Sequence, residues 1–131
     1  MKPHFYESAD PTAPTLLMVP GLDGTALLFF RQLPLLTKRF NVVAFPLPDD
    51  PACTMDSLIE DLDRRIEEVS PGPILLCGES FGGALGMSYA LAHPERLAGL
   101  VILNSFPRIR ARLQLELAPH VLRMLPWGAM P

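Results

Sequence analysis

The sequence contains 131 residues, which is enough for one domain with a hydrophobic core. Hydrophobic residues make up 49% of it and charged residues 19%. The net charge is −3 and there is no run of lysine or arginine, so nucleic acid and anionic membranes are not expected as partners. Cys53 and Cys77 form neither a disulfide framework nor a zinc pattern, and there is no signal peptide or 20-residue apolar span. We expect a cytoplasmic protein with reduced thiols, no transmembrane segment and no metal.

The first half of the chain alternates apolar runs with loops rich in proline and glycine. A continuous apolar run is typical of a strand that is buried on both faces of a parallel sheet. Pro34 must kink or split any helix around it, because proline has no N–H and its ring clashes inside a helix. In order, we predict a short edge strand at 4–6, a buried strand at 15–19, a loop at 20–25, a helical stretch at 26–39 and a second strand at 41–45.

The second half repeats the pattern and contains the most regular predicted helix, at 54–69. Its apolar residues recur every three or four positions and form one stripe, while its many charged residues form a solvated face. Ser57 with Glu60 is a candidate capping box for this helix. A strand at 74–77, a helix at 83–92 and a strand at 100–103 follow, and beyond Asn104 the chain becomes basic and amphipathic, over 108–123.

Five residues between the 74–77 strand and the next helix, Gly78-Glu79-Ser80-Phe81-Gly82, form a G-x-S-x-G sequence. Strand, G-x-S-x-G and helix together are typical of a nucleophile elbow. A serine nucleophile must stand clear of the sheet on a tight turn, and the residues two before and two after it must lack bulk, because the strand and the helix pass close together. The helix that begins at Phe81 also directs free N–H groups toward this point.

The other interpretation of these residues is a glycine-rich turn with an incidental serine, for example a phosphate loop. The sequence contains neither G-x-x-x-x-G-K-[ST] nor a strand followed by G-x-G-x-x-G, so a phosphate or dinucleotide cofactor is not expected. The alternation of strands and helices predicts an α/β fold with right-handed crossovers, in which a mostly parallel sheet of about four strands has helices on both faces.

With Pro20-Gly21-Leu22-Asp23-Gly24-Thr25 after the first strand and Gly-Glu-Ser-Phe-Gly-Gly at 78–83, the chain resembles the α/β-hydrolase superfamily, from about residue 12 to about residue 125. Within it, the motifs are similar to those of esterase and acyltransferase-like members, including plastid phytyl ester synthases. The resemblance implies that Ser80 is the nucleophile, that the backbone N–H groups of Leu22 and Phe81 form the oxyanion hole, and that the substrate is a small ester or acyl compound. It also implies that residues 1–105 are the N-terminal part of the hydrolase core, and that 106–131 begin a cap and lack the strands that follow it.

Two acidic residues beside these motifs have open roles. Asp23 either contacts substrate or, as the more common alternative, bonds to its own turn. Glu79 either tunes the site electrostatically or is an ordinary hydrogen-bonded carboxylate.

A serine nucleophile needs a histidine base and an acid that orients it, and in this fold they follow the serine in the order acid, histidine. After Ser80 the carboxylates are Glu95 and Glu116, and the histidines are His93 and His120. His93 ends the predicted elbow helix, on the far side from the serine. A Glu95/His120 pair has the right order along the chain and is the less favoured alternative to an acid and a histidine on the strands that follow in the family. Three hypotheses follow: a serine ester hydrolase or acyltransferase of which this is the N-terminal part, a non-catalytic binding or interaction module, and a half-enzyme completed by another chain.

The apolar strand at 100–103 also predicts self-association. In the family's strand order this strand is interior, and without its next neighbour it becomes an edge with unpaired backbone groups. We therefore expect the isolated chain to aggregate or to dimerise through that edge.

Overall fold

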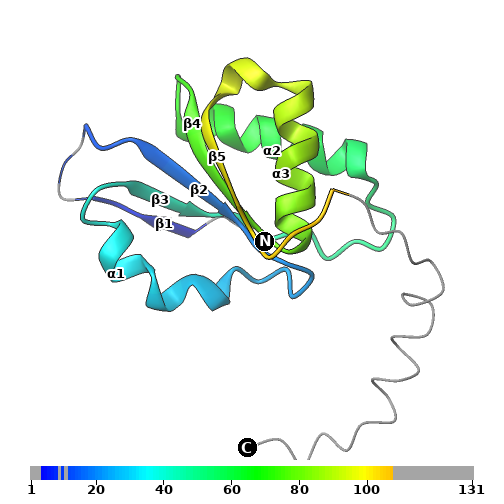
Figure 1. The fold of residues 1–131 in the computed structure, drawn as a ribbon, viewed down its shortest axis with the longest axis horizontal. Coiled ribbons are helices and arrows are strands. Elements are labelled where there is room, and N and C mark those ends of the chain that lie inside the picture. Colours follow the sequence, from blue (N-terminus) through cyan, green and yellow to red (C-terminus); the bar gives the residue numbers. More distant parts are fainter. Residues whose placement is uncertain (1–3, 9, 11, 108–131) are drawn as a thin grey trace, which may run out of the picture.

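The computed structural model describes residues 4–8, 10 and 12–107 of the chain (Figure 1). They form one five-stranded sheet in the order β1-β3-β2-β4-β5. The strands are β1 (His4–Tyr6), β2 (Thr15–Val19), β3 (Asn41–Ala44), β4 (Ile74–Glu79) and β5 (Leu97–Leu103). The helices are the 3₁₀ helix η1 (Leu27–Arg31), α1 (Leu33–Leu36), α2 (Met55–Val69), α3 (Phe81–Ala92) and the 3₁₀ helix η2 (Pro94–Arg96).

Four of the five strands are parallel. β2 pairs with β3 on one side and with β4 on the other, and β5 pairs with β4, whereas β1 runs antiparallel to β3 at the far edge. The predicted α/β class with four parallel strands is therefore confirmed, and the predicted strand at 4–6 is its antiparallel edge. The carboxyl ends of the parallel strands meet at one edge of the sheet, which is where ligands bind in open α/β sheets.

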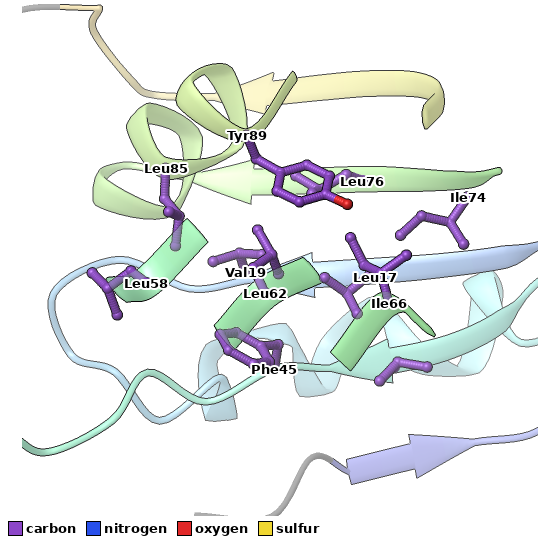
Figure 2. Packing of buried hydrophobic residues seen from close by; sticks show 11 residues of the cluster. Leu17, Val19, Phe45, Leu58, Leu62, Ile66, Ile74, Leu76, Leu85 and Tyr89 are labelled. Carbon is purple, nitrogen blue, oxygen red and sulfur yellow. The ribbon is translucent and has the colours of Figure 1, made fainter. Parts of the chain in front are cut away.

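Helices cover both faces of the sheet. α2 and α3 cover one face, where alternate residues of β2, β3 and β4 meet the apolar stripe of α2 (Figure 2). η1 and α1 cover the opposite face. The α2/α3 core consists of Leu17, Val19, Val43, Phe45, Leu58, Leu62, Ile66, Ile74, Leu76, Leu85 and Tyr89.

The 26–39 stretch is helical only in part, because the chain forms η1 and then the short α1. Pro34 lies in the first turn of α1, where a missing N–H is tolerated. The predicted split at proline is thus confirmed, while the predicted continuation to residue 39 is wrong. The last strand is longer than predicted, since β5 begins at Leu97 rather than at residue 100.

The predicted capping box of α2 is wrong by one turn. Thr54, not Ser57, is the N-cap: its hydroxyl accepts a hydrogen bond of 3.1 Å from the Ser57 N–H, and the Ser57 hydroxyl accepts one of 2.9 Å from the Thr54 N–H. A capping box needs an acceptor three residues after the cap, and serine fills that place here instead of the Glu or Gln that the common motif has.

The amphipathic stretch 108–123 and nearly all of the predicted 106–131 cap region lie outside the described residues. Within residues 4–107, as far as they are described, there is no helix with the length and apolar character needed to cross a membrane.

Candidate nucleophile elbow

Ser80 occupies the turn between β4 and α3 in a conformation that side chains rarely adopt. Its φ is 52° and its ψ is −116°. A residue held in such a region costs on the order of 1–3 kcal/mol and persists only where its surroundings fix it. Here the surroundings are the end of a central strand and the start of a buried helix, as the G-x-S-x-G pattern predicts.

The two glycines of the motif allow strand and helix to approach closely. A Cβ at Gly78 would collide with the carbonyl oxygen of Gly82, and a Cβ at Gly82 would collide with the carbonyl of Val19 and lie 2.5 Å from that of Pro20. The elbow therefore packs backbone against backbone, both within itself and onto the loop after β2.

The backbone of Ser80 is held from both sides by β5 and the residues after it. Its N–H donates a hydrogen bond of 2.9 Å to the carbonyl of Leu103, and its carbonyl accepts one of 2.5 Å from the hydroxyl of Ser105. The Gly83 N–H donates to the same carbonyl at 3.1 Å. Ser105 carries no sequence signal for this role, because only the pairing of β5 with β4 brings it to the elbow.

The hydroxyl of Ser80 remains available. A serine at a helix N-cap usually accepts a hydrogen bond from the N–H of the second or third helical residue, but Ser80 caps α3 without any such bond. The N–H of Phe81, the first residue of α3, has no intrahelical acceptor. Among the residues that the structure describes, the turn thus presents a hydroxyl beside a backbone donor that has no acceptor.

The loop after β2 lies directly against the elbow. A Cβ at Gly21 would be 3.2 Å from the Cβ of Ser80. Leu22 is therefore the residue directly after the point where this loop touches the elbow. Leu22 is 79% exposed, and its backbone N–H has no acceptor among the described residues. The five residues singled out from the sequence (Leu22, Gly78, Ser80, Phe81 and Gly82) therefore gather at one point of the structure.

Of the two acidic residues with open roles, Asp23 is a turn residue. Its carboxylate accepts a hydrogen bond of 2.6 Å from the Thr25 hydroxyl and one of 3.3 Å from the Thr25 N–H. Glu79 instead reaches across to the other loop, where its Oε2 accepts a hydrogen bond of 3.1 Å from the Gly21 N–H. This bond joins residues 58 positions apart, and the sequence gives no sign of it.

Two hollows flank the carboxyl edge of the sheet. One, of about 430 Å³, lies on the α2/α3 side, and the other, of about 520 Å³, lies on the η1 side. Leu22, Asp23, Gly24, Thr25, Leu47, Pro48, Asp49, Cys53, Leu58 and Phe81 line the first; Met18, Leu28, Phe29, Gln32, Glu79, Ile102, Leu103 and Asn104 line the second. Both have room for parts of a small apolar molecule.

His93 is at the opposite end of α3 from Ser80. It follows Ala92, so the 12-residue helix separates the two by roughly 18 Å. Its ring stacks on Tyr89 at 5.0 Å, and its Nδ1 is 3.9 Å from a carboxylate oxygen of Glu95. The histidine that the sequence places nearest to the motif is thus not a partner of Ser80.

Comparison with known proteins identifies the family of the fold. The family model described as the alpha/beta hydrolase fold matches residues 14–126, and the chain belongs to this family. Phytyl ester synthase 1 of Arabidopsis thaliana chloroplasts is 34% identical over 96 residues, which are 70% of this chain and 14% of that protein. RutD of Caulobacter segnis, whose name marks it as a proposed carbamate hydrolase, is 28% identical over 109 residues, which are 76% of this chain and 40% of RutD.

Solved structures show the same fold. A structure from a study of carboxylesterases of Nitrososphaera gargenis superposes with a TM-score of 0.76 at 26% identity, and the match covers 92% of this chain and 47% of that one. The chain thus spans less than half the length of these three proteins.

Proposed function

We propose that this chain carries the nucleophile of a serine hydrolase or acyltransferase that acts on carboxylic esters, and that the nucleophile is Ser80. The observation that carries the proposal is the conformation of Ser80: a strained turn at the carboxyl edge of the sheet, with a hydroxyl that caps no helix. The similarity to an ester synthase and to a carboxylesterase structure supports the substrate class.

In the proposed reaction the Ser80 Oγ attacks the carbonyl carbon of the ester while its proton passes to a general base. The carbonyl oxygen becomes an oxyanion, which the N–H groups of Leu22 and Phe81 stabilise. The C–O bond then breaks, the alcohol leaves with the proton, and the acyl group stays on Ser80 until water or a second alcohol takes it. Losing one oxyanion donor typically lowers the rate about 100- to 1,000-fold.

In this proposal, neither the general base nor the acid that orients it is among the described residues. His93 is excluded by its place at the far end of α3. A serine without a base stays protonated and is weakly nucleophilic. We therefore expect residues 1–131 alone to hydrolyse p-nitrophenyl esters far more slowly than about 1 s⁻¹, the lower end of ordinary enzyme turnover. Faster turnover that His120→Ala abolishes would instead identify a base within this chain.

A fluorophosphonate probe tests the nucleophile directly. The protein expressed from its complete reading frame should label at one serine, and Ser80→Ala should abolish the labelling. Ser88→Ala is the matched control, because this hydroxyl lies on α3 and, among the described residues, donates to the Ala84 carbonyl alone. Labelling of Ser80→Ala at the wild-type rate would refute the assignment, and absence of labelling in the wild type would favour a non-catalytic binding module.

A further inference from the structure

We propose that Glu79 is a positioning residue that holds the loop after β2 in register with the elbow, so that the Leu22 N–H faces the reacting carbonyl oxygen. This inference rests on the proposed function of Ser80. It starts from the hydrogen bond between the Gly21 N–H and the Glu79 carboxylate, 3.1 Å long, which joins the two halves of the site.

The backbone of Glu79 is itself fixed. It is the last residue of β4, and its Cα is paired with that of Leu103 on β5. The adjacent Ser80 N–H is also bonded to β5, through the Leu103 carbonyl. The carboxylate therefore extends from a rigid strand end, and a loop that it binds takes its position from the same strand that presents the nucleophile.

Position 21 matches this arrangement. A Cβ there would lie 2.9 Å from the Glu79 Oε2, closer than a carbon and an oxygen normally approach. Glycine lets the carboxylate sit directly against the backbone N–H. A bond between a charged acceptor and a backbone donor is about twice as strong as a neutral one.

The hydrogen bond to Glu79 uses the N–H of Gly21 and does not involve the N–H of Leu22. With the Gly21 N–H engaged, the adjacent Leu22 N–H has no acceptor among residues 4–107, as far as they are described. The Gly24 N–H closes the turn by donating to the Gly21 carbonyl at 3.0 Å. The loop thus has a tether at Gly21 and a closed turn at Gly24, and the N–H groups of Leu22 and Asp23 between them have no acceptor among the described residues.

The charge of Glu79 does not itself favour the reaction's oxyanion, because two negative charges at close range repel each other. A positioning role and an electrostatic role therefore predict different behaviour for substitutions that separate charge from reach. Glu79→Gln keeps the reach and an acceptor oxygen but removes the charge, whereas Glu79→Asp keeps the charge but shortens the side chain by one methylene.

The experiment uses the protein from its complete reading frame, p-nitrophenyl acetate as substrate and the fluorophosphonate probe. We expect Glu79→Asp and Glu79→Ala to lower kcat and the labelling rate about 10- to 100-fold, with KM changed by less than about threefold, because the lost interaction acts in the transition state. Glu79→Gln should stay within about fivefold of wild type. Amide exchange at Gly21 should be faster in Glu79→Asp than in wild type.

Other outcomes separate this inference from the proposed function. If Glu79→Asp reacts at the wild-type rate while Ser80→Ala is inert, the positioning role is wrong and the nucleophile stands. A loss in Glu79→Gln as large as that in Glu79→Asp would assign the effect to charge and overturn the inference. Lower melting temperatures with unchanged kcat would leave Glu79 a purely structural brace, which also overturns it. If the wild type neither labels nor turns over, the proposed function fails, and the positioning role fails with it.

Discussion

The hydroxyl of Tyr89 on α3 donates a hydrogen bond of 2.7 Å to the Oδ1 of Asp63 on α2. The Tyr89 residue is completely buried, and Figure 2 shows its ring in the core between the helices and the sheet. The Nε of Arg96, just after α3, lies 3.7 Å from the same carboxylate oxygen. Asp63 thus joins both helices of this face to the turn before β5, at the end of α3 opposite the elbow.

Tyr89→Phe should destabilise the fold with little change in its shape, because it removes the hydroxyl and keeps the ring. A hydrogen bond to a charged group contributes about 1.5–3 kcal/mol, so we expect a loss of about 2 kcal/mol in the free energy of unfolding. Urea denaturation followed by circular dichroism measures it. Ser88→Ala, one position away on the same helix, should change stability by less than about 0.5 kcal/mol. Equal losses in both variants would contradict the role of the Tyr89–Asp63 bond.

The same residue predicts sensitivity to alkali. Burial, and then the hydrogen bond to Asp63 and its charge, raise the pKa of Tyr89 well above its ordinary value of about 10. The unfolded chain therefore releases this proton at lower pH than the folded chain, so the contribution of Tyr89 is complete below about pH 10 and declines as the pH rises beyond it. Unfolding free energies of wild type and Tyr89→Phe should converge between about pH 10 and pH 11.5. A constant difference across that range would contradict the assignment.

Gly82→Ala should be strongly destabilising even though alanine is normally the better residue in a helix. Its Cβ would meet the backbone carbonyls of Val19 and Pro20, which cannot move without displacing β2. Overpacking typically costs about 1–3 kcal/mol and sometimes more, and a clash with backbone rather than with a flexible side chain belongs at the upper end, above the roughly 1 kcal/mol gained from helix propensity. Gly72→Ala is the control, because nothing lies within 4 Å of a Cβ there. Thermal melts should show a lower midpoint for Gly82→Ala alone.

Self-association of residues 1–131 is expected through β5. In the part of the chain that the structure describes, this strand is an edge of the sheet, and its apolar residues Val101, Ile102 and Leu103 are 46%, 39% and 42% exposed. Because a charge on an edge strand opposes pairing, Val101→Lys should shift the chain toward monomer in sedimentation at about 50 μM. Leu35→Lys places the same charge on α1 and should leave association unchanged. A monomeric wild type would refute this prediction.

Much of the fold follows from local pattern. The buried strands are recognisable in the sequence as continuous apolar runs, because both of their faces are buried. Helix α2 is recognisable because Leu58, Leu62 and Ile66 recur every four residues and form its one buried face. The elbow is predictable from Gly78 and Gly82, because a side chain at either position would collide with neighbouring backbone. The predicted capping box at Ser57 and Glu60 is wrong because serine followed three residues later by glutamate matches the common motif, whereas the box that forms consists of two hydroxyl residues, Thr54 and Ser57.

Contacts made across the fold leave no such trace. The hydrogen bonds from the Gly21 N–H to Glu79 and from the Ser105 hydroxyl to the Ser80 carbonyl depend on the register between β4 and its neighbours. Strand register is a property of the assembled sheet, so a hydroxyl or carboxylate that fits only in that register looks like any other polar residue in the sequence.

The hydrogen bonds that hold the Ser80 backbone also indicate which part of the chain can be varied without disturbing the elbow. The described hydrogen bonds to the Ser80 backbone come from residues 83 to 105, two positions before Pro107. Libraries that vary the chain after Pro107, or that graft a foreign cap there, therefore leave these bonds untouched. In the enzyme that we propose, such variation would act on substrate preference and leave the backbone geometry of Ser80 unchanged, so Pro107 is a suitable junction for chimeras.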